Sequence, residues 1–179
     1  MRPDQPRPTD GRGVLGHASS TDLHTWEAGP PLSSPGEGGQ LEVPQVVRLN
    51  GAWWAIFSAF WSDHSAARLA RPGVVAEGGT HYLVADNPLG PYALDGDAFL
   101  LGDPQVSDYA GRVLHHQGAW WLFAWHHVDG QGRFFGELLS DPIPLTVDQN
   151  GSLWLADDPR SQDRRAPAAG PGPRPAGDR

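Results

Sequence analysis

Glu42 and Tyr109 are the side chains whose positions best suit chemistry. Glu42 lies nine residues before Gly51, Tyr109 lies nine residues before Gly118, and each glycine opens the same Gly-Ala-Trp-Trp motif. The two positions are therefore equivalent in an internal repeat. A partly buried glutamate in an apolar setting is a good general acid. Glycoside hydrolysis requires two carboxylates that flank the scissile bond, and Glu42 is the one good candidate in this sequence.

The elements around these residues recur with the motif. Two hairpins are predicted, at residues 44–54 and 111–121, each a strand, a tight turn containing glycine and a second strand. Asn50-Gly51 is a strong hairpin signal, because both residues adopt positive φ readily. Alternation along a strand places Glu42, Pro44 and Val46 on one face, so Glu42 and Tyr109 are expected to point toward the mouth of a shared channel.

A second element lies between the hairpins: a short strand, a turn opened by an aspartate and another short strand. It occurs around Asp22, Asp86 and Asp141. One hairpin plus one such element makes four strands, which is the unit of a β-propeller blade. No stretch shows a helical apolar period with caps, so the predicted fold class is all-β, with antiparallel four-stranded blades.

The predicted blades account for only part of a ring. Residues 13–32 supply the outer half of one blade, residues 40–95 a full blade and residues 105–155 another, or about two and a half blades. Propellers close with about four to eight blades. We therefore expect residues 13–155 to form a partial propeller, completed by a separate N-terminal half or by self-association through its open blade edges. The segments 1–12 and 156–179 are rich in Pro, Gly and Arg and are predicted to be disordered.

Composition excludes several classes of protein. The 179 residues carry a net charge of −8 and no cysteine, which excludes a disulfide framework and a cysteine nucleophile. The acidic balance argues against binding to nucleic acid. The longest apolar run, about ten residues from Ala52 to Trp61, is too short for a membrane helix, which needs about 20. No signal peptide is recognisable, so a cytoplasmic location is the default expectation, and secretion the alternative if an N-terminal segment has been lost.

Neither a cofactor nor a metal is expected. The sequence contains no phosphate-binding or dinucleotide-binding glycine motif. The pairs His115-His116 and His126-His127 invite a metal interpretation, but adjacent strand residues point to opposite faces and cannot chelate one ion.

Four stretches together resemble glycoside hydrolase family 32, the β-fructofuranosidase family of five-bladed propellers. The element around Asp22 resembles A-x-S-x-D-L-x-x-W, and residues 136–145 resemble the G-x-x-S-x-P-R-x-L stretch. Glu42-Val43-Pro44 resembles the E-C-P motif, whose glutamate is the general acid/base, and Ser107-Asp108-Tyr109-Ala110 resembles D-x-Y-A, in a segment that contacts substrate. The resemblance implies a fructoside ligand, with Glu42 catalytic and Tyr109 and Asp108 in contact with sugar. Trp125 takes the place of a further family element and is a candidate for sugar stacking or for packing.

The departures from the family pattern limit this expectation. The aspartate of D-x-Y-A is replaced by Ser107, and the arginine of the later motif is replaced by Ile143. The motifs that supply the nucleophilic aspartate and the transition-state stabiliser, W-M-N-D-P-N-G and R-D-P, do not occur. The sequence therefore predicts a β-fructosidase-like protein in truncated or split form, inactive by itself. Two alternatives stay open: a non-catalytic carbohydrate-binding propeller, and a fragment of a family 43-type arabinanase or xylosidase.

Overall fold

The computed structural model describes residues 12–72, 74, 76–94, 98–129, 131, 133, 138–148 and 151–156. The predicted disordered ends therefore lie outside the described residues, except for Arg12 and Ala156. No helix in the described ranges is long and apolar enough to cross a membrane. The elements in chain order are β1 (Ala18–Ser19), β2 (Glu27–Ala28), β3 (Glu42–Leu49), β4 (Ala52–Ala59), the 3-10 turn η1 (Trp61–Asp63), α1 (Ala66–Leu69), β5 (Gly78–Ala85), β6 (Phe99–Asp103), β7 (Asp108–His116), β8 (Ala119–His126), β9 (Ile143–Val147) and β10 (Leu153–Leu155).

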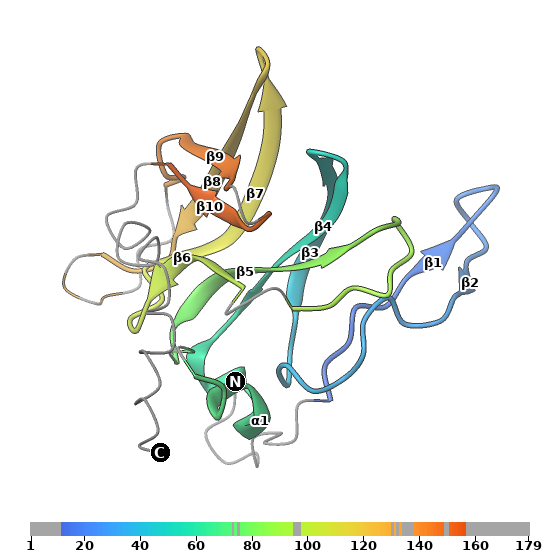
Figure 1. Cartoon of the computed structure of the whole chain (residues 1–179), viewed down its shortest axis with the longest axis horizontal. Helices are drawn as coiled ribbons and strands as arrows, with labels where there is room; N and C mark the ends of the chain where they lie inside the picture. The colour runs from blue at the N-terminus through green and yellow to red at the C-terminus, as the bar shows by residue number, and fades with distance from the viewer. Residues whose placement is uncertain are drawn as a thin grey trace, which may run out of the picture.

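Two four-stranded antiparallel sheets form the body of the molecule (Figure 1). Their strand orders are β3-β4-β5-β6 and β7-β8-β9-β10, so each sheet is a meander in sequence order. The all-β class and the partial propeller predicted from the repeat are confirmed. Both predicted hairpins are present as β3–β4 and β7–β8. Their turns have positive φ at equivalent residues, 50° and 88° at Asn50-Gly51 and 50° and 80° at Gln117-Gly118.

An apolar core joins the two sheets face to face. Trp54, Ile56 and Tyr82 of the first sheet pack against Val113 and Leu122 of the second. The opposite face of the first sheet packs on a second apolar cluster. Because both of its faces are covered, β4 is buried from Trp54 to Ala59, which explains its continuous apolar run.

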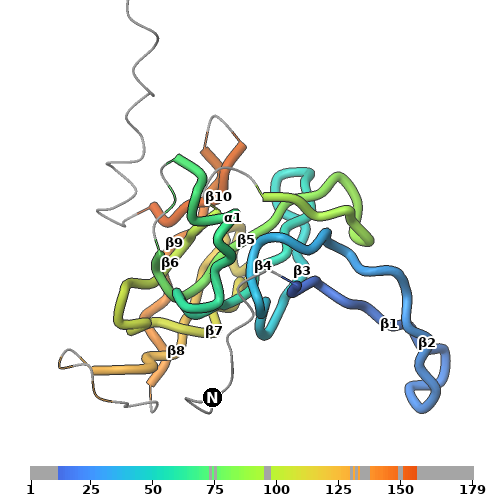
Figure 2. The backbone as a smooth tube through the Cα atoms, turned by 90° about the horizontal axis from the view of Figure 1, so that it is seen from below, coloured from blue at the N-terminus to red at the C-terminus, as the bar shows by residue number. Residues whose placement is uncertain are grey.

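The second cluster is completed by the N-terminal segment. Backbone amides of Gly29 and Leu32 donate to the carbonyls of His17 and Leu15, which continues the β1–β2 pairing toward the first sheet. Leu15 and Leu32 are buried against that sheet. The part of this ribbon beyond the sheet forms an arm that projects away from the body in both views (Figures 1 and 2). The ribbon occupies the place of the half blade predicted at residues 13–32.

The predicted end of the first blade is wrong. The blade was expected to finish at residue 95, after the element around Asp86. The outermost strand of the first sheet is instead β6. After a short bridge between Val84 and Ala93, the chain pairs with β5 again, from His81↔Phe99 to Gly78↔Asp103. The pairing with β5 is interrupted rather than ended, and that interruption resembles a blade boundary in the sequence.

The innermost strands are also less regular than predicted. Each carries a bulge near its start, where register shifts between Glu42 and Gln45 in β3 and between Tyr109 and Arg112 in β7. The expected alternation of Glu42, Pro44 and Val46 on one face is therefore broken. The bulges contain residues in the left-handed region, Val43 with φ of 44° and Ala110 with φ of 54°. Bulges re-aim neighbouring side chains.

Val43 allows the strain at the first bulge to be measured. Left-handed φ is unfavourable for a β-branched residue, with a cost of about 1–3 kcal/mol. Val43→Gly should therefore leave stability unchanged or raise it by up to about 1 kcal/mol. Val46→Gly is the matched control, because Val46 is similarly exposed but lies in the regular part of β3. It should destabilise by about 1 kcal/mol. Urea denaturation measures both variants, and equal destabilisation would contradict strain at Val43.

Candidate functional site

Glu42 and Tyr109 lie together where the two sheets meet. We define the site end of the molecule as the end where β3 and β7 begin and where β4 and β8 finish. There the Tyr109 hydroxyl donates a 2.6 Å hydrogen bond to Oε2 of Glu42. The bond joins Glu42, the first residue of β3, to Tyr109, the second residue of β7. The sequence-based expectation that the two side chains share one location agrees with this geometry.

The environment keeps Tyr109 protonated. Burial raises the pKa of the Tyr109 hydroxyl, and the hydrogen bond to Glu42 and the charges of Glu42 and Asp63 raise it further. The phenol is therefore a fixed hydrogen-bond donor to the carboxylate at neutral pH. A charge-assisted bond of this length restrains the orientation of Glu42 and satisfies part of its hydrogen-bonding capacity.

Aromatic rings lie around Tyr109. The Tyr109 ring lies 4.9 Å from Phe60 and 5.9 Å from His127, measured between centroids. Trp125 is the cross-strand neighbour of Tyr109, and its ring lies 5.1 Å from His127. Phe60 and His127 are themselves repeat-equivalent, each following the second strand of its sheet. The site end thus combines a carboxylate with aromatic surfaces, a combination suited to the C–H faces and hydroxyls of sugars.

Asp108 also lies at the site end, but its carboxylate contacts another group. Oδ1 of Asp108 is 2.7 Å from Nδ1 of His126, its cross-strand neighbour. Tyr109 and Trp125 form the adjacent cross-strand pair, so alternation places Asp108 and His126 on the other face of the sheet. Both side chains are partly exposed. The structure thus brings Glu42, Tyr109 and Trp125 together, whereas Asp108 lies with His126 on the other face of the sheet.

Side chains bridge the two innermost strands. The amide of Gln45 forms a reciprocal pair with the backbone of Val113: Nε2 donates to the carbonyl at 2.9 Å, and Oε1 accepts from the amide at 2.8 Å. Nη1 of Arg112 donates to the carbonyl of Val43 at 2.6 Å. Together with the Glu42–Tyr109 bond, these contacts form what we call the seam between β3 and β7. Behind the seam, β7 also approaches β5 closely, since a Cβ on Gly111 of β7 would lie 2.4 Å from the hydroxyl of Thr80 in β5.

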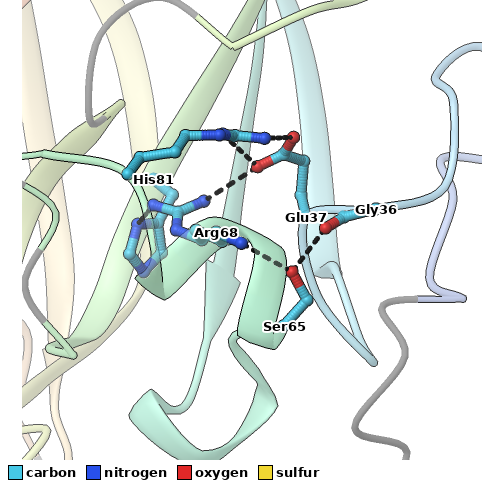
Figure 3. Close-up of polar contacts among 6 residues, drawn as sticks. Gly36, Glu37, Ser65, Arg68 and His81 are labelled. Carbon is cyan, nitrogen blue, oxygen red and sulfur yellow. Dashed lines mark hydrogen bonds and ion pairs between the residues drawn. The ribbon is translucent and has the colours of Figure 1, made fainter.

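A charged network anchors the segment that leads into Glu42 (Figure 3). Both oxygens of Glu37 accept hydrogen bonds from Arg71, at 2.8 and 2.6 Å. Buried Arg68 lies between Glu37 and His81, with Nη2 3.1 Å from Nδ1 of the histidine. Because arginine is always a donor, this contact makes Nδ1 of His81 an acceptor. Ser65 caps α1 and also donates to the carbonyl of Gly36.

His64 borders this network and is held neutral. Its ring lies 5.1 Å from that of His81. Both of its ring nitrogens are buried and lack a hydrogen-bond partner among the described residues. Burial, and then the charge of Arg68, lower the pKa of His64 from 6.5 to about 4. The folded protein therefore resists protonation of this ring.

His64 should make stability depend on pH. The unfolded chain binds a proton at His64 below about pH 6.5, whereas the folded chain does so only near pH 4. Stability contributed by neutral His64 should therefore be complete above pH 6.5 and fall progressively toward pH 4. His64→Phe should reduce the loss of stability between those pH values in urea denaturation. His24→Gln, a substitution at an exposed histidine, is the control. An unaltered profile in His64→Phe would contradict this assignment.

The described residues contain no group of three or more histidine, aspartate or glutamate side chains that could hold a metal ion. The His115 ring lies 4.9 Å from that of Trp120, and Nδ1 of His126 contacts Asp108, so these two histidines have separate surroundings.

Solved structures with a similar fold include several fructan enzymes. Inulosucrase of Halalkalicoccus jeotgali, bound to kestose, superposes with a TM-score of 0.64 and 21% identity over 79% of this chain and 39% of its own. Levansucrase of Bacillus subtilis gives a TM-score of 0.60 with 17% identity, over 81% and 34%. A β-fructofuranosidase mutant of Microbacterium saccharophilum gives 0.60 with 20% identity, over 80% and 30%.

These likenesses show that the chain shares the propeller fold of these proteins over part of their length. The chain spans less than two fifths of the length of each of these three proteins. No family model and no curated protein sequence matches it. The resemblance to family 32 in particular thus stays a sequence-based interpretation.

Sequence reasoning missed several residues of the site. It did not identify Gln45, Phe60 or His127. The repeat could have identified Phe60 and His127, because they are 67 residues apart, the same spacing as the two Gly-Ala-Trp-Trp motifs. Gln45 has no such signal, since its role depends on the distance between two strands that sequence does not specify.

Proposed function

We propose that this chain carries the acid/base side of a fructoside-binding glycosidase site. The observation that carries the proposal is the 2.6 Å bond between Tyr109 and Glu42 among aromatic rings at the site end. In this proposal Glu42 is the general acid/base, Tyr109 fixes the carboxylate, and Trp125 contacts the sugar. The sugar contact predicted for Asp108 is not retained, because its carboxylate is held by His126 on the other face of the sheet. The similar fold of fructan enzymes supports the choice of ligand class.

The chemistry assigned to Glu42 is that of a retaining mechanism. In a complete site, a second carboxylate attacks the anomeric carbon of the fructoside as the bond to the leaving oxygen breaks. Glu42 transfers its proton to that oxygen. Glu42 then removes a proton from the water that displaces the carboxylate. Tyr109 remains a hydrogen-bond donor to Glu42 throughout.

The described residues favour binding over cleavage. Retaining enzymes hold their two carboxyl groups about 5 Å apart across the scissile bond. At the site end, the carboxylate of Asp108 is held by His126, and Asp63 is buried within η1, where it accepts from the amide of Phe60. Neither lies open beside Glu42. A non-catalytic carbohydrate-binding role is therefore the second candidate function, and it uses the same residues.

The 179-residue chain should bind fructosides without cleaving them. We expect isothermal calorimetry to detect kestose binding, and sugar analysis to detect no fructose released from sucrose, inulin or levan. Glu42→Gln and Tyr109→Phe should each weaken kestose binding about three- to tenfold, because each removes one hydrogen-bonding partner.

Glu27→Gln is the control for these variants, because Glu27 is an exposed carboxylate on the arm. It should bind kestose like the wild type. Absence of binding to any fructoside would contradict the proposed function. If the wild-type chain hydrolysed these sugars robustly and Glu42→Gln abolished that activity, the chain would have to contain a second catalytic carboxylate, contrary to the proposal.

A further inference from the structure

Trp61 is an exposed aromatic side chain at the site end that the proposed mechanism does not use. It opens η1 directly after β4. Its side chain is 44% exposed, whereas most large apolar residues of β4 are buried. Single exposed apolar residues are common on protein surfaces. Trp61 differs from such residues because it directly follows Phe60, whose ring packs on Tyr109 in the site.

The chain connects Trp61 directly to the site. Its neighbour Phe60 packs on Tyr109, whose hydroxyl contacts Glu42. Asp63, two residues further on, lies close enough for its charge to raise the pKa of Tyr109. The η1 turn therefore borders the Glu42–Tyr109 pair, and Trp61 lies on its exposed side.

The turn that carries Trp61 is held from several directions. The amide of Phe60 donates to Oδ2 of Asp63 at 3.3 Å, and the amide of Asp63 donates back to the Phe60 carbonyl at 2.9 Å. The amide of Gly39 donates to the Asp63 carbonyl at 2.7 Å. A rigid aromatic on a fixed turn loses little conformational entropy when a ligand stacks on it.

We propose that Trp61 is an outer sugar-stacking platform, which extends the site from Glu42 to a further residue of an oligosaccharide. This inference rests on the proposed function. The indole offers a flat apolar face to the C–H face of a sugar ring. Because Trp61 follows Phe60, the residue whose ring packs on Tyr109, we assign the platform to a sugar unit beyond the two of a disaccharide. The favoured ligand class is thus a fructoside of three or more units.

The test compares two sugars and two tryptophans. Calorimetry measures the binding of kestose, a trisaccharide, and of sucrose to the wild-type chain, Trp61→Ala and Trp26→Ala. Trp26 is a suitable control, because it is 56% exposed and directly precedes β2, which belongs to the arm that projects from the body (Figure 1). Trp61→Ala should weaken kestose binding about fivefold and change sucrose binding by less than about twofold. Trp26→Ala should change neither.

Two further variants guard against a folding artefact. Trp61→Phe keeps an aromatic face and should retain most of the kestose affinity, whereas Trp61→Gln removes the face in a second way and should behave like Trp61→Ala. Urea denaturation of each variant shows that it is folded. Unchanged kestose binding in Trp61→Ala and Trp61→Gln would overturn the inference, as would an equal loss for sucrose and kestose. These results leave the proposed function standing, whereas a wild-type chain that binds neither sugar would overturn both.

Discussion

The seam between β3 and β7 is the constraint on which the site depends. The two strands belong to different sheets and cannot pair through their backbones. Gln45 closes the gap by placing a side-chain amide where a neighbouring strand would present a peptide group, with both hydrogen bonds to Val113 below 3 Å. The Glu42–Tyr109 bond is one contact of the same seam. Any change in the spacing of the sheets therefore acts directly on the carboxylate.

Local backbone strain accompanies this arrangement. Val43 and Ala110 occupy left-handed conformations immediately after Glu42 and Tyr109 in the chain. These bulges break strand alternation at equivalent points of the two sheets and turn both side chains to one location. The charged network of Glu37, Arg68 and Arg71 holds the preceding segment (Figure 3). Strained residues beside a restrained carboxylate are typical of functional sites.

Much of the fold could be predicted from sequence, because the sequence contains an internal repeat. The Gly-Ala-Trp-Trp motifs predicted both hairpins, and their register identified Glu42 and Tyr109 as equivalents. The bulges could not be predicted, since neither Val nor Ala favours positive φ. The extension of the first sheet to Asp103 was missed because a gap in pairing looks like a blade boundary. The contacts of Asp108 with His126 and of Gln45 with Val113 depend on distances that a linear pattern does not contain.

We propose that a fructoside binds where Glu42 and Tyr109 meet. The most direct test is to titrate the isotope-labelled chain with kestose and to follow backbone and side-chain resonances by NMR. We expect shifts concentrated at the side-chain carboxyl of Glu42, the ring of Tyr109 and the indole of Trp125, with the arm at Ala18–Ser19 and Glu27–Ala28 unaffected. Shifts confined to the arm or to the far ends of the sheets, with those three residues unchanged, would contradict it.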